Sequence, residues 1–211
     1  FEQTLGYGTI NAPANDPFVL TVGATKDAGT PSRADDTITT YSSKGPTMLD
    51  HIVKPDLVAP GNQMIAARAP GSLLGTKLPG NLIGADYYLS SGRSDEPVYL
   101  RLNGTSMASG VVSGIAALMI GRDATLSPDT VKARLMKTAT RDFPAKSVTV
   151  DPDTNVAYES IHDLFTTGTG LVDAAAAVDD QTVVPAGQLA LSPTAKLNED
   201  GTVSLSLTKL S

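Results

Sequence analysis

The stretch "LNGTSMASGVVSGIAALMIG", residues 102–121, joins a short polar turn to a long segment rich in Ala, Gly and apolar residues. From Ser106 onward the apolar residues recur at the spacing of a helix. They are Ala108, Val111, Val112, Ile115, Ala116 and Met119. Gly110 and Gly114 lie on one face, where each lowers helix propensity by about 1 kcal/mol relative to Ala. Close approach of neighbouring backbone is the usual compensation, so we expect a central helix that is packed on all sides.

Short runs of β-forming residues come before this helix, and further helical patterns come after it. Strands are predicted at residues 18–24, 37–43, 56–59, 62–68 and 98–102. Residues 69–97, rich in Gly, Ser and Pro, are predicted to be a long surface excursion. A second helix is predicted in "SPDTVKARLMKTA" (127–139), capped by Ser127, and a short one in "GTGLVDAAAAV" (168–178). Strands that alternate with helices favour an α/β domain with a mainly parallel sheet.

The composition excludes several classes of protein. The chain has 211 residues, of which 41% are hydrophobic and 18% charged, which is typical of a globular domain with a real core. The net charge of −6, with scattered Lys and Arg, argues against a nucleic-acid partner. With no cysteine, the chain has no disulfide, cysteine nucleophile or thiolate metal site. No apolar run reaches the roughly 20 residues of a membrane span.

Ser106 follows Gly104-Thr105 at the predicted start of the central helix. Helix starts offer backbone N–H groups and a positive dipole end, which suit a developing oxyanion. A serine hydroxyl becomes a nucleophile when a base, usually His, lies within hydrogen-bond reach. Two interpretations therefore stand side by side at this point: a nucleophile site, or Thr105 or Ser106 acting merely as the helix cap.

A longer motif around Ser106 favours the nucleophile interpretation, because it resembles that of a known family. "NGTSMASGVVSGIAAL" (103–118) resembles the active-site serine motif of the subtilisin-like serine proteases, the subtilases. Flanking segments fall in that family's order: "NAPANDPFVLTVGA" (11–24), "TYSSKGPT" (40–47), "KPDLVAPG" (54–61) and "GTGLVDAAAAV" (168–178). Gly110 departs from the pattern, because the family more often has Pro there. The resemblance implies a subtilisin-like three-layer α/β fold whose C-terminal half is residues 1–180.

The resemblance also assigns roles to residues. Ser106 would be the acylating nucleophile, its own backbone N–H one oxyanion donor, and Thr105 a support of the oxyanion hole. Asn11, Ala12 and Pro13 match the segment that walls the pocket for the residue before the scissile bond. Because Ala12 is small, we expect that pocket to take a medium or large apolar side chain. The implied substrates are proteins or peptides, and this chemistry requires no cofactor.

The base half of that machinery is not found in this sequence. The family places its Asp and His in Asp-Ser/Thr-Gly and His-Gly-Thr-His motifs before the serine, and neither motif occurs here. The Ala-Gly-Asn segment that carries the family's oxyanion Asn is also missing, and Asn103 belongs to a different position. His51 and His162 are predicted to be surface or structural residues. Since "FEQTLGYGTI" (1–10) begins part-way through a loop, we expect an N-terminal part of the same protease as partner.

No metal site is supported by the spacing of acidic residues. Asp35 and Asp36 are predicted to lie in a solvated turn. Asp16, Asp151 and Asp153 could join a structural calcium site, but they do not follow a calcium-binding pattern.

Two hypotheses on function follow. The first is a serine endopeptidase that works through an acyl-enzyme at Ser106, with Asp, His and oxyanion Asn supplied by an N-terminal portion, and with the extracellular location usual in the family. The alternative is an inactive subtilase-fold module used for binding or assembly. Residues 181–211 are predicted to be a linker and the beginning of a β-rich module. We further expect that residues 1–180 do not fold stably alone, since they would expose a sheet edge and faces of the central helix.

Overall fold

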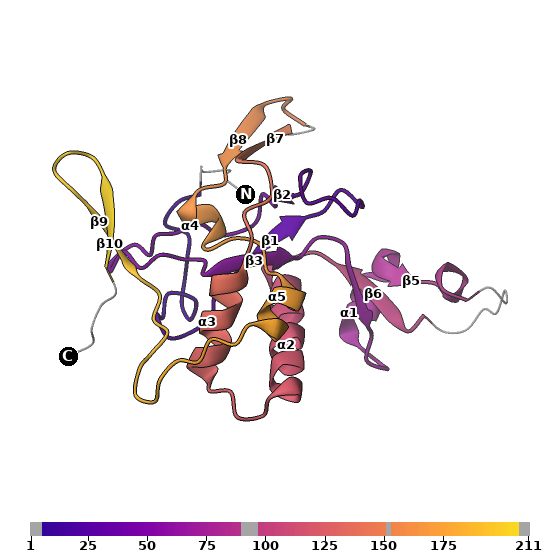
Figure 1. The fold of residues 1–211 in the computed structure, drawn as a ribbon. Helices are drawn as coiled ribbons and strands as arrows, with labels where there is room; N and C mark the ends of the chain where they lie inside the picture. The colour runs from indigo at the N-terminus through magenta and orange to yellow at the C-terminus, as the bar shows by residue number, and fades with distance from the viewer. Residues whose placement is uncertain (1–5, 90–96, 151–152, 207–211) are drawn as a thin grey trace.

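The computed structural model describes residues 6–89, 97–150 and 153–206 (Figure 1). Its strands are β1 (Val22–Lys26), β2 (Thr37–Ile38), β3 (Leu57–Pro60), β4 (Met64–Ala67), β5 (Leu82–Ile83), β6 (Tyr99–Leu102), β7 (Lys146–Val150), β8 (Ala157–Ile161), β9 (Thr194–Leu197) and β10 (Val203–Ser206). Its helices are α1 (Leu73–Lys77), α2 (Thr105–Arg122), α3 (Pro128–Thr138), α4 (Leu164–Thr167) and α5 (Ala174–Asp179), with short 3-10 turns at Pro79–Asn81 and Ala85–Tyr87.

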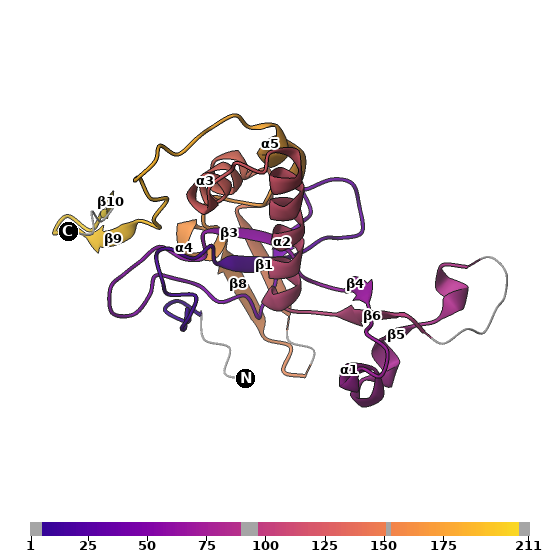
Figure 2. The same cartoon turned by 90° about the horizontal axis from the view of Figure 1, so that it is seen from below.

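A small sheet in the order β2-β1-β3 forms the centre of the molecule. β1 and β3 run parallel, with Val22 opposite Leu57, and β2 pairs antiparallel with the end of β1. The α2, α3 and α5 helices lie on one side of β1 and β3, whereas α4 lies on the other (Figures 1 and 2). This is the expected α/β arrangement in three layers.

The core lies between this sheet and α2. Alternate residues of β1 and β3 point toward α2 because side chains of a strand alternate between its two faces. They meet a row of α2 residues at helical spacing: Ala108, Val112, Ile115 and Met119. On the opposite face of the sheet, Val58 packs with Ile38 and Leu171.

The expectation that α2 is packed on all sides was wrong for this chain. Its opposite face, which carries Ser109, Gly110, Ser113 and Gly114, is exposed. A Cβ added at Gly110 or Gly114 would meet nothing within 4 Å. By length and composition α2 could also cross a membrane, but core helices pass the same test, and the buried row of α2 packs on a sheet. The small residues on the open face have no neighbour in the described chain to approach closely.

Several predicted boundaries shift in the structure. The strand expected at 18–24 begins at Val22 and ends at Lys26, and the one expected at 37–43 has only Thr37 and Ile38. The excursion 69–97 contains short helical turns and β5, which pairs with β6. With β4 it builds an arm that extends away from the sheet (Figures 1 and 2). The polar stretch after α3, in which no strand was predicted, contains the β7–β8 hairpin.

The chain beyond α5 runs back across α3 before it reaches the β9–β10 hairpin (Figure 1). We call residues 180–193 the strap. The carbonyl of Thr182 accepts a bond from Arg134 Nε at 2.7 Å, and the N–H of Ala190 donates to Asp129 Oδ1 at 2.8 Å. At its end, the N–H of Val53 donates to the Pro193 carbonyl at 2.8 Å. These bonds fix the strap against the same body that carries α2.

Candidate active site

The motif segments converge at the start of α2. The backbone N–H of Gly104 donates to the carbonyl of Gly61 at 2.9 Å, and the Tyr41 hydroxyl donates to the same carbonyl at 3.0 Å. The Ser42 hydroxyl accepts from the N–H of Ala24 at 3.0 Å. These bonds tie "TYSSKGPT", "KPDLVAPG" and the end of the first motif segment to the turn before Ser106.

Two glycines make this convergence possible. A Cβ on Gly61 would lie 2.8 Å from both the Ala24 Cβ and the Gly104 carbonyl oxygen, so the segments approach closely only because Gly61 lacks one. Gly104 has φ +153°, a conformation that side chains rarely adopt. The backbone can therefore turn sharply from β6 into α2, and this turn brings Ser106 to the surface.

Ser106 is the second residue of α2, and its side chain is exposed. The N-cap is Gly104, and no side chain caps the helix. The interpretation of Thr105 or Ser106 as the cap is therefore wrong. The first N–H groups bonded to Gly104 O are those of Met107 and Ala108, at 3.1 and 3.3 Å. Within residues 6–89, 97–150 and 153–206, the backbone N–H groups of Thr105 and Ser106 donate no hydrogen bond to another backbone group.

No described side chain accepts the proton of the Ser106 hydroxyl. Of the two histidines, His162 has both ring nitrogens occupied, with Nδ1 donating to the Pro144 carbonyl and Nε2 bonded to Ser147 Oγ at 3.0 Å. Burial lowers the pKa of His162, which favours its neutral ring. His51 is exposed and lies beside the strap end, where its carbonyl accepts from Ala195 N. Both histidines therefore occupy structural or surface positions.

Asn11, Ala12 and Pro13 lie together on an exposed turn. The turn is closed by a bond from Ala14 N to the Asn11 carbonyl at 2.8 Å and by one from Asp16 N to the Pro13 carbonyl at 3.2 Å. The Thr21 hydroxyl holds the Ala14 carbonyl at 2.8 Å. The turn is thus hydrogen-bonded at its base and open to solvent at its tip.

The acidic candidates do not assemble into a metal site. Asp36 is buried rather than solvated, contrary to expectation, and burial together with nearby Asp27 and Asp35 raises its pKa. Asp16 caps its own turn by accepting from Phe18 N, Asp153 is exposed, and Asp151 lies outside the described residues. Among the described residues, no group of three or more acidic or histidine side chains could hold a metal ion.

Two features of this region were not predicted from the sequence. The hydroxyl of Tyr41, a residue of one of the motif segments, bonds to the Gly61 carbonyl beside Gly104. Lys54 and Asp56, at the predicted start of a strand, form a buried ion pair at 2.8 Å. A lysine beside a proline and an aspartate before an apolar strand was a visible signal for a buried pair.

A hollow of about 420 Å³ lies between the open face of α2, α3 and the segment before β1. Its lining includes Phe18, Leu20, Ser113, Ile120 and Leu126. Along the edge of β1 opposite β3, β2 pairs only with Thr25 and Lys26. The start of β1 therefore lacks a strand partner along that edge within the described chain. An apolar hollow and an unpaired strand edge therefore adjoin the exposed helix face.

Comparison with known proteins now identifies the family. The model of the subtilase family, Peptidase S8, matches residues 4–170, which is most of the chain. The chain belongs to the subtilase family. Within that family, this subtilase is 38% identical over 132 residues to the serine protease AprX of Bacillus subtilis, covering 63% of the chain and 27% of AprX. It is 37% identical over 106 residues to the subtilisin-like protease SBT1.3 of Arabidopsis thaliana, covering 48% of the chain and 12% of that protein.

Solved structures agree on the fold of this subtilase. Fervidolysin from Fervidobacterium pennivorans, a keratinolytic enzyme, aligns with a TM-score of 0.53 at 19% identity, over 92% of the chain and 26% of fervidolysin. The CspB protease of Clostridium perfringens aligns with a TM-score of 0.50 at 22% identity, over 82% of the chain and 29% of that structure. The chain thus spans about a quarter of AprX, fervidolysin and the CspB structure and 12% of SBT1.3.

Proposed function

We propose that this subtilase chain supplies the nucleophile of a serine endopeptidase. The observation that carries the proposal is the first turn of α2, where an exposed Ser106 hydroxyl stands beside backbone N–H groups that donate to no other described backbone group. A structural serine at a helix start would cap the helix. Ser106 does not, and membership of the subtilase family supports a peptidase role for it.

In this role Ser106 Oγ attacks the carbonyl carbon of a peptide bond while a base takes the hydroxyl proton. The N–H of Ser106 then donates to the developing oxyanion, as the positive end of α2 favours. As the C–N bond breaks, the base returns the proton to the leaving amine, and the acyl-enzyme remains on Ser106. A water molecule then hydrolyses that ester.

The base, its Asp and the oxyanion Asn come, in this proposal, from an N-terminal part of the same protease, either in one polypeptide or as a separate chain. Support comes from the exposed face of α2, the apolar hollow beside it and the unpaired start of β1. Together they offer a helix face, a cavity and a strand edge to one partner segment. An apolar hollow beside an exposed helix face and an unpaired strand edge is the kind of surface that a partner segment covers.

A fluorophosphonate, which reacts only with activated serines, tests the proposal. We expect it to label Ser106 in the complete protein and to leave this chain alone unlabelled, because the chain alone lacks the base. Peptide mapping of the adduct and intact masses of all polypeptides would be measured together.

Ser109→Ala is the matched control for Ser106→Ala. Ser109 is exposed on the same helix, but its hydroxyl donates to the Thr105 carbonyl at 2.9 Å. Labelling should survive the loss of Ser109 and disappear with Ser106. A folded complete protein that stays unlabelled would overturn the proposal in favour of the inactive binding module.

We also propose an extracellular location. One relative, 29% identical over 136 residues, is named as a CO(2)-response secreted protease of Arabidopsis thaliana. Detection of the protein in culture medium, with a cytoplasmic marker as control, would test this.

A further inference from the structure

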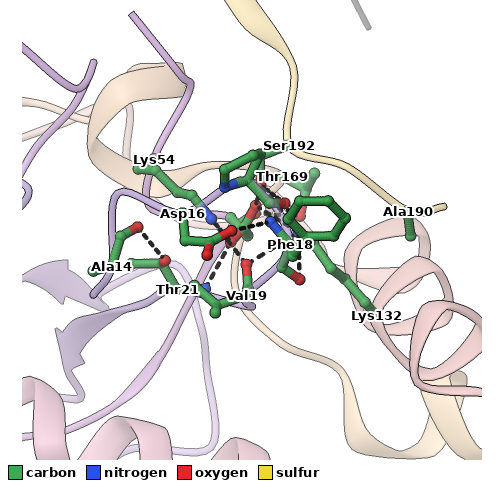
Figure 3. A network of polar contacts seen from close by, with 12 residues as sticks. Ala14, Asp16, Phe18, Val19, Thr21, Lys54, Lys132, Thr169, Ala190 and Ser192 are labelled. Atoms are coloured by element: carbon green, nitrogen blue, oxygen red, sulfur yellow. Dashed lines mark hydrogen bonds and ion pairs between the residues drawn. The ribbon is translucent and has the colours of Figure 1, made fainter. Parts of the chain in front are cut away.

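A buried polar network lies beneath the turn of residues 11–15 (Figure 3). Its members come from distant parts of the chain: Lys54 and Asp56 lie just before β3, Lys132 lies on α3, and Ser192 lies on the strap. Their exposed fractions are 0%, 2%, 5% and 1%. Charged side chains are almost never buried this far unless they are paired and hydrogen-bonded, so each polar atom here should have a defined partner.

The charges in this network do not balance by themselves. Asp56 Oδ2 lies 2.8 Å from Lys54 Nζ, and Asp56 Oδ1 lies 3.8 Å from Lys132 Nζ, so one carboxylate faces two ammonium groups. The remaining ammonium hydrogens need neutral acceptors, since Lys carries three donors and no acceptor.

Consecutive backbone carbonyls supply these acceptors. Lys132 Nζ donates to the carbonyls of Pro17 at 2.7 Å, Phe18 at 3.4 Å and Val19 at 3.0 Å. Lys54 Nζ also donates to the Val19 carbonyl, at 2.9 Å. Carbonyls that all point to buried ammonium groups cannot rotate away without leaving a charge unsatisfied. The path of residues 17–19 is therefore set by the two lysines.

Ser192 connects the strap to the same point. Its backbone N–H donates to the Pro17 carbonyl at 3.0 Å, and its hydroxyl accepts from Lys132 Nζ at 3.0 Å. The hydroxyl proton is directed to Asp56 Oδ1, with the Pro17 carbonyl 3.2 Å away. Figure 3 shows Ser192 and Lys132 approaching the segment before β1 from two different elements.

The fixed segment passes directly into the exposed turn of residues 11–15. Only Asp16 lies between them, and its carboxylate accepts from Phe18 N at 2.8 Å, which couples the turn to the fixed carbonyls. On the far side, Thr21 joins the two by its bond to the Ala14 carbonyl and by donating its N–H to Asp56 Oδ2 at 2.6 Å. A shift of the fixed segment would therefore carry the turn with it.

We propose that Lys132 and Ser192 are positioning residues for the turn of residues 11–15, and so determine which side chain fits before the scissile bond. This inference rests on the proposed peptidase function, because the turn matters only if it walls a substrate pocket. Neither residue touches the substrate. They act through the Pro17 and Val19 carbonyls, and misplacement of a substrate-positioning group by about 1 Å can cost about 10²-fold in rate.

The experiment compares Lys132→Met, Ser192→Ala and Lys137→Met in the complete protein. Lys137 lies on the same helix and also binds the strap, at Asp180 Oδ2 (2.8 Å) and Thr182 Oγ1 (2.6 Å), but it does not touch residues 17–19. The readout is kcat/KM on two peptides that differ only in the residue before the scissile bond, one large and apolar, one small. The rate of Ser106 labelling by a small fluorophosphonate that does not occupy that pocket is measured beside it.

We expect Lys132→Met and Ser192→Ala to change the ratio of the two kcat/KM values by about 10-fold, mostly through KM, because the turn moves. The labelling rate should stay at the unsubstituted level, and Lys137→Met should leave both readouts unchanged. If Lys132→Met does not fold, Ser192→Ala, which removes one hydroxyl, still decides the question.

An unchanged ratio in Ser192→Ala would overturn the proposal, even if the protein lost stability, because the network would then only hold the fold. A ratio that also changed in Lys137→Met would overturn it as well. The failure of the proposed function looks different: the unsubstituted protein would then cleave neither peptide.

Discussion

Two serines of this chain show opposite ways to use a hydroxyl. Ser106 is exposed at the start of α2, and its hydroxyl bonds to no described side chain. Ser192 is buried on the strap, where its hydroxyl contacts Asp56, Lys132 and the Pro17 carbonyl. Both are serines, so residue type alone does not distinguish them.

The two serines show that the reactive position of this subtilase and its rigid buried network lie at different places in the fold. A buried hydroxyl that accepts from a lysine and donates to a carboxylate is held in one orientation and is closed off from a substrate. An unpartnered hydroxyl at a helix start can donate its proton to a base and attack a substrate, but it adds little to stability. The framework around Ser192 should therefore control shape, and the turn around Ser106 should control chemistry.

The largest expected effect separates these roles. Ser106→Ala in the complete protein should lower kcat for peptide hydrolysis by about 10⁶-fold, the size seen for the serine of subtilisin, with an unchanged melting temperature. Rates would be measured on a chromogenic peptide and stability by calorimetry. A Ser106→Ala protein that kept its activity would show that peptide hydrolysis does not depend on Ser106.

Asp56→Asn instead removes the negative charge from the buried network around Ser192. It leaves two buried ammonium groups without a counter-charge, and breaking a buried ion pair in this way costs about 3–5 kcal/mol of unfolding free energy. Urea unfolding of the complete protein would measure the loss. The matched control is Asp179→Asn, which removes the exposed partner of Arg122 and should leave the unfolding midpoint unchanged. Equal midpoints for both variants would contradict a framework role for Asp56.

The pH dependence of stability sharpens the same point. Burial lowers the pKa of Lys132 from 10.5 to about 8, and nearby Asp56 offsets only part of that effect. Between these values the unfolded chain binds a proton that the folded chain does not, so the contribution of Lys132 to stability rises with pH from about 8 toward 10.5. Relative to Lys132→Met, the protein should gain about 1–2 kcal/mol between pH 8 and 9.5 by urea unfolding. If the unfolding free energies of the two proteins changed equally with pH, Lys132 would not titrate between these pH values.

The smallest effect tests the open face beside Ser106. Gly114→Ala adds a Cβ where nothing lies within 4 Å, so for an uncovered helix it should raise stability by about 1 kcal/mol. If an N-terminal part packs closely on this face in the complete protein, the sign reverses, because the added methyl group must displace its neighbour. Unfolding midpoints of the complete protein would show which sign holds.

Much of the fold was accessible from local patterns. The periodicity of Ala108, Val112, Ile115 and Met119 predicted the central helix and its buried row, and Ser127 does cap α3 by accepting from Thr130 N at 3.1 Å. The family followed from motifs in a fixed order, and the family model agrees. The β7–β8 hairpin was missed because the alternation of polar and apolar residues from Ser147 to Val150 is short and most residues of both strands are exposed.

The sequence by itself determined the helix, the family and the nucleophile candidate, because these depend on residues that are close together in the chain. Only the tertiary structure decided that Gly61 touches Gly104, that His162 is already occupied and that Lys54, Asp56, Lys132 and Ser192 share one buried site. Such contacts join residues as far apart as Asp56 and Ser192, a separation of 136 positions. No local periodicity encodes a pairing over that distance, since it is the packing of strap, helix and sheet that brings the charges together.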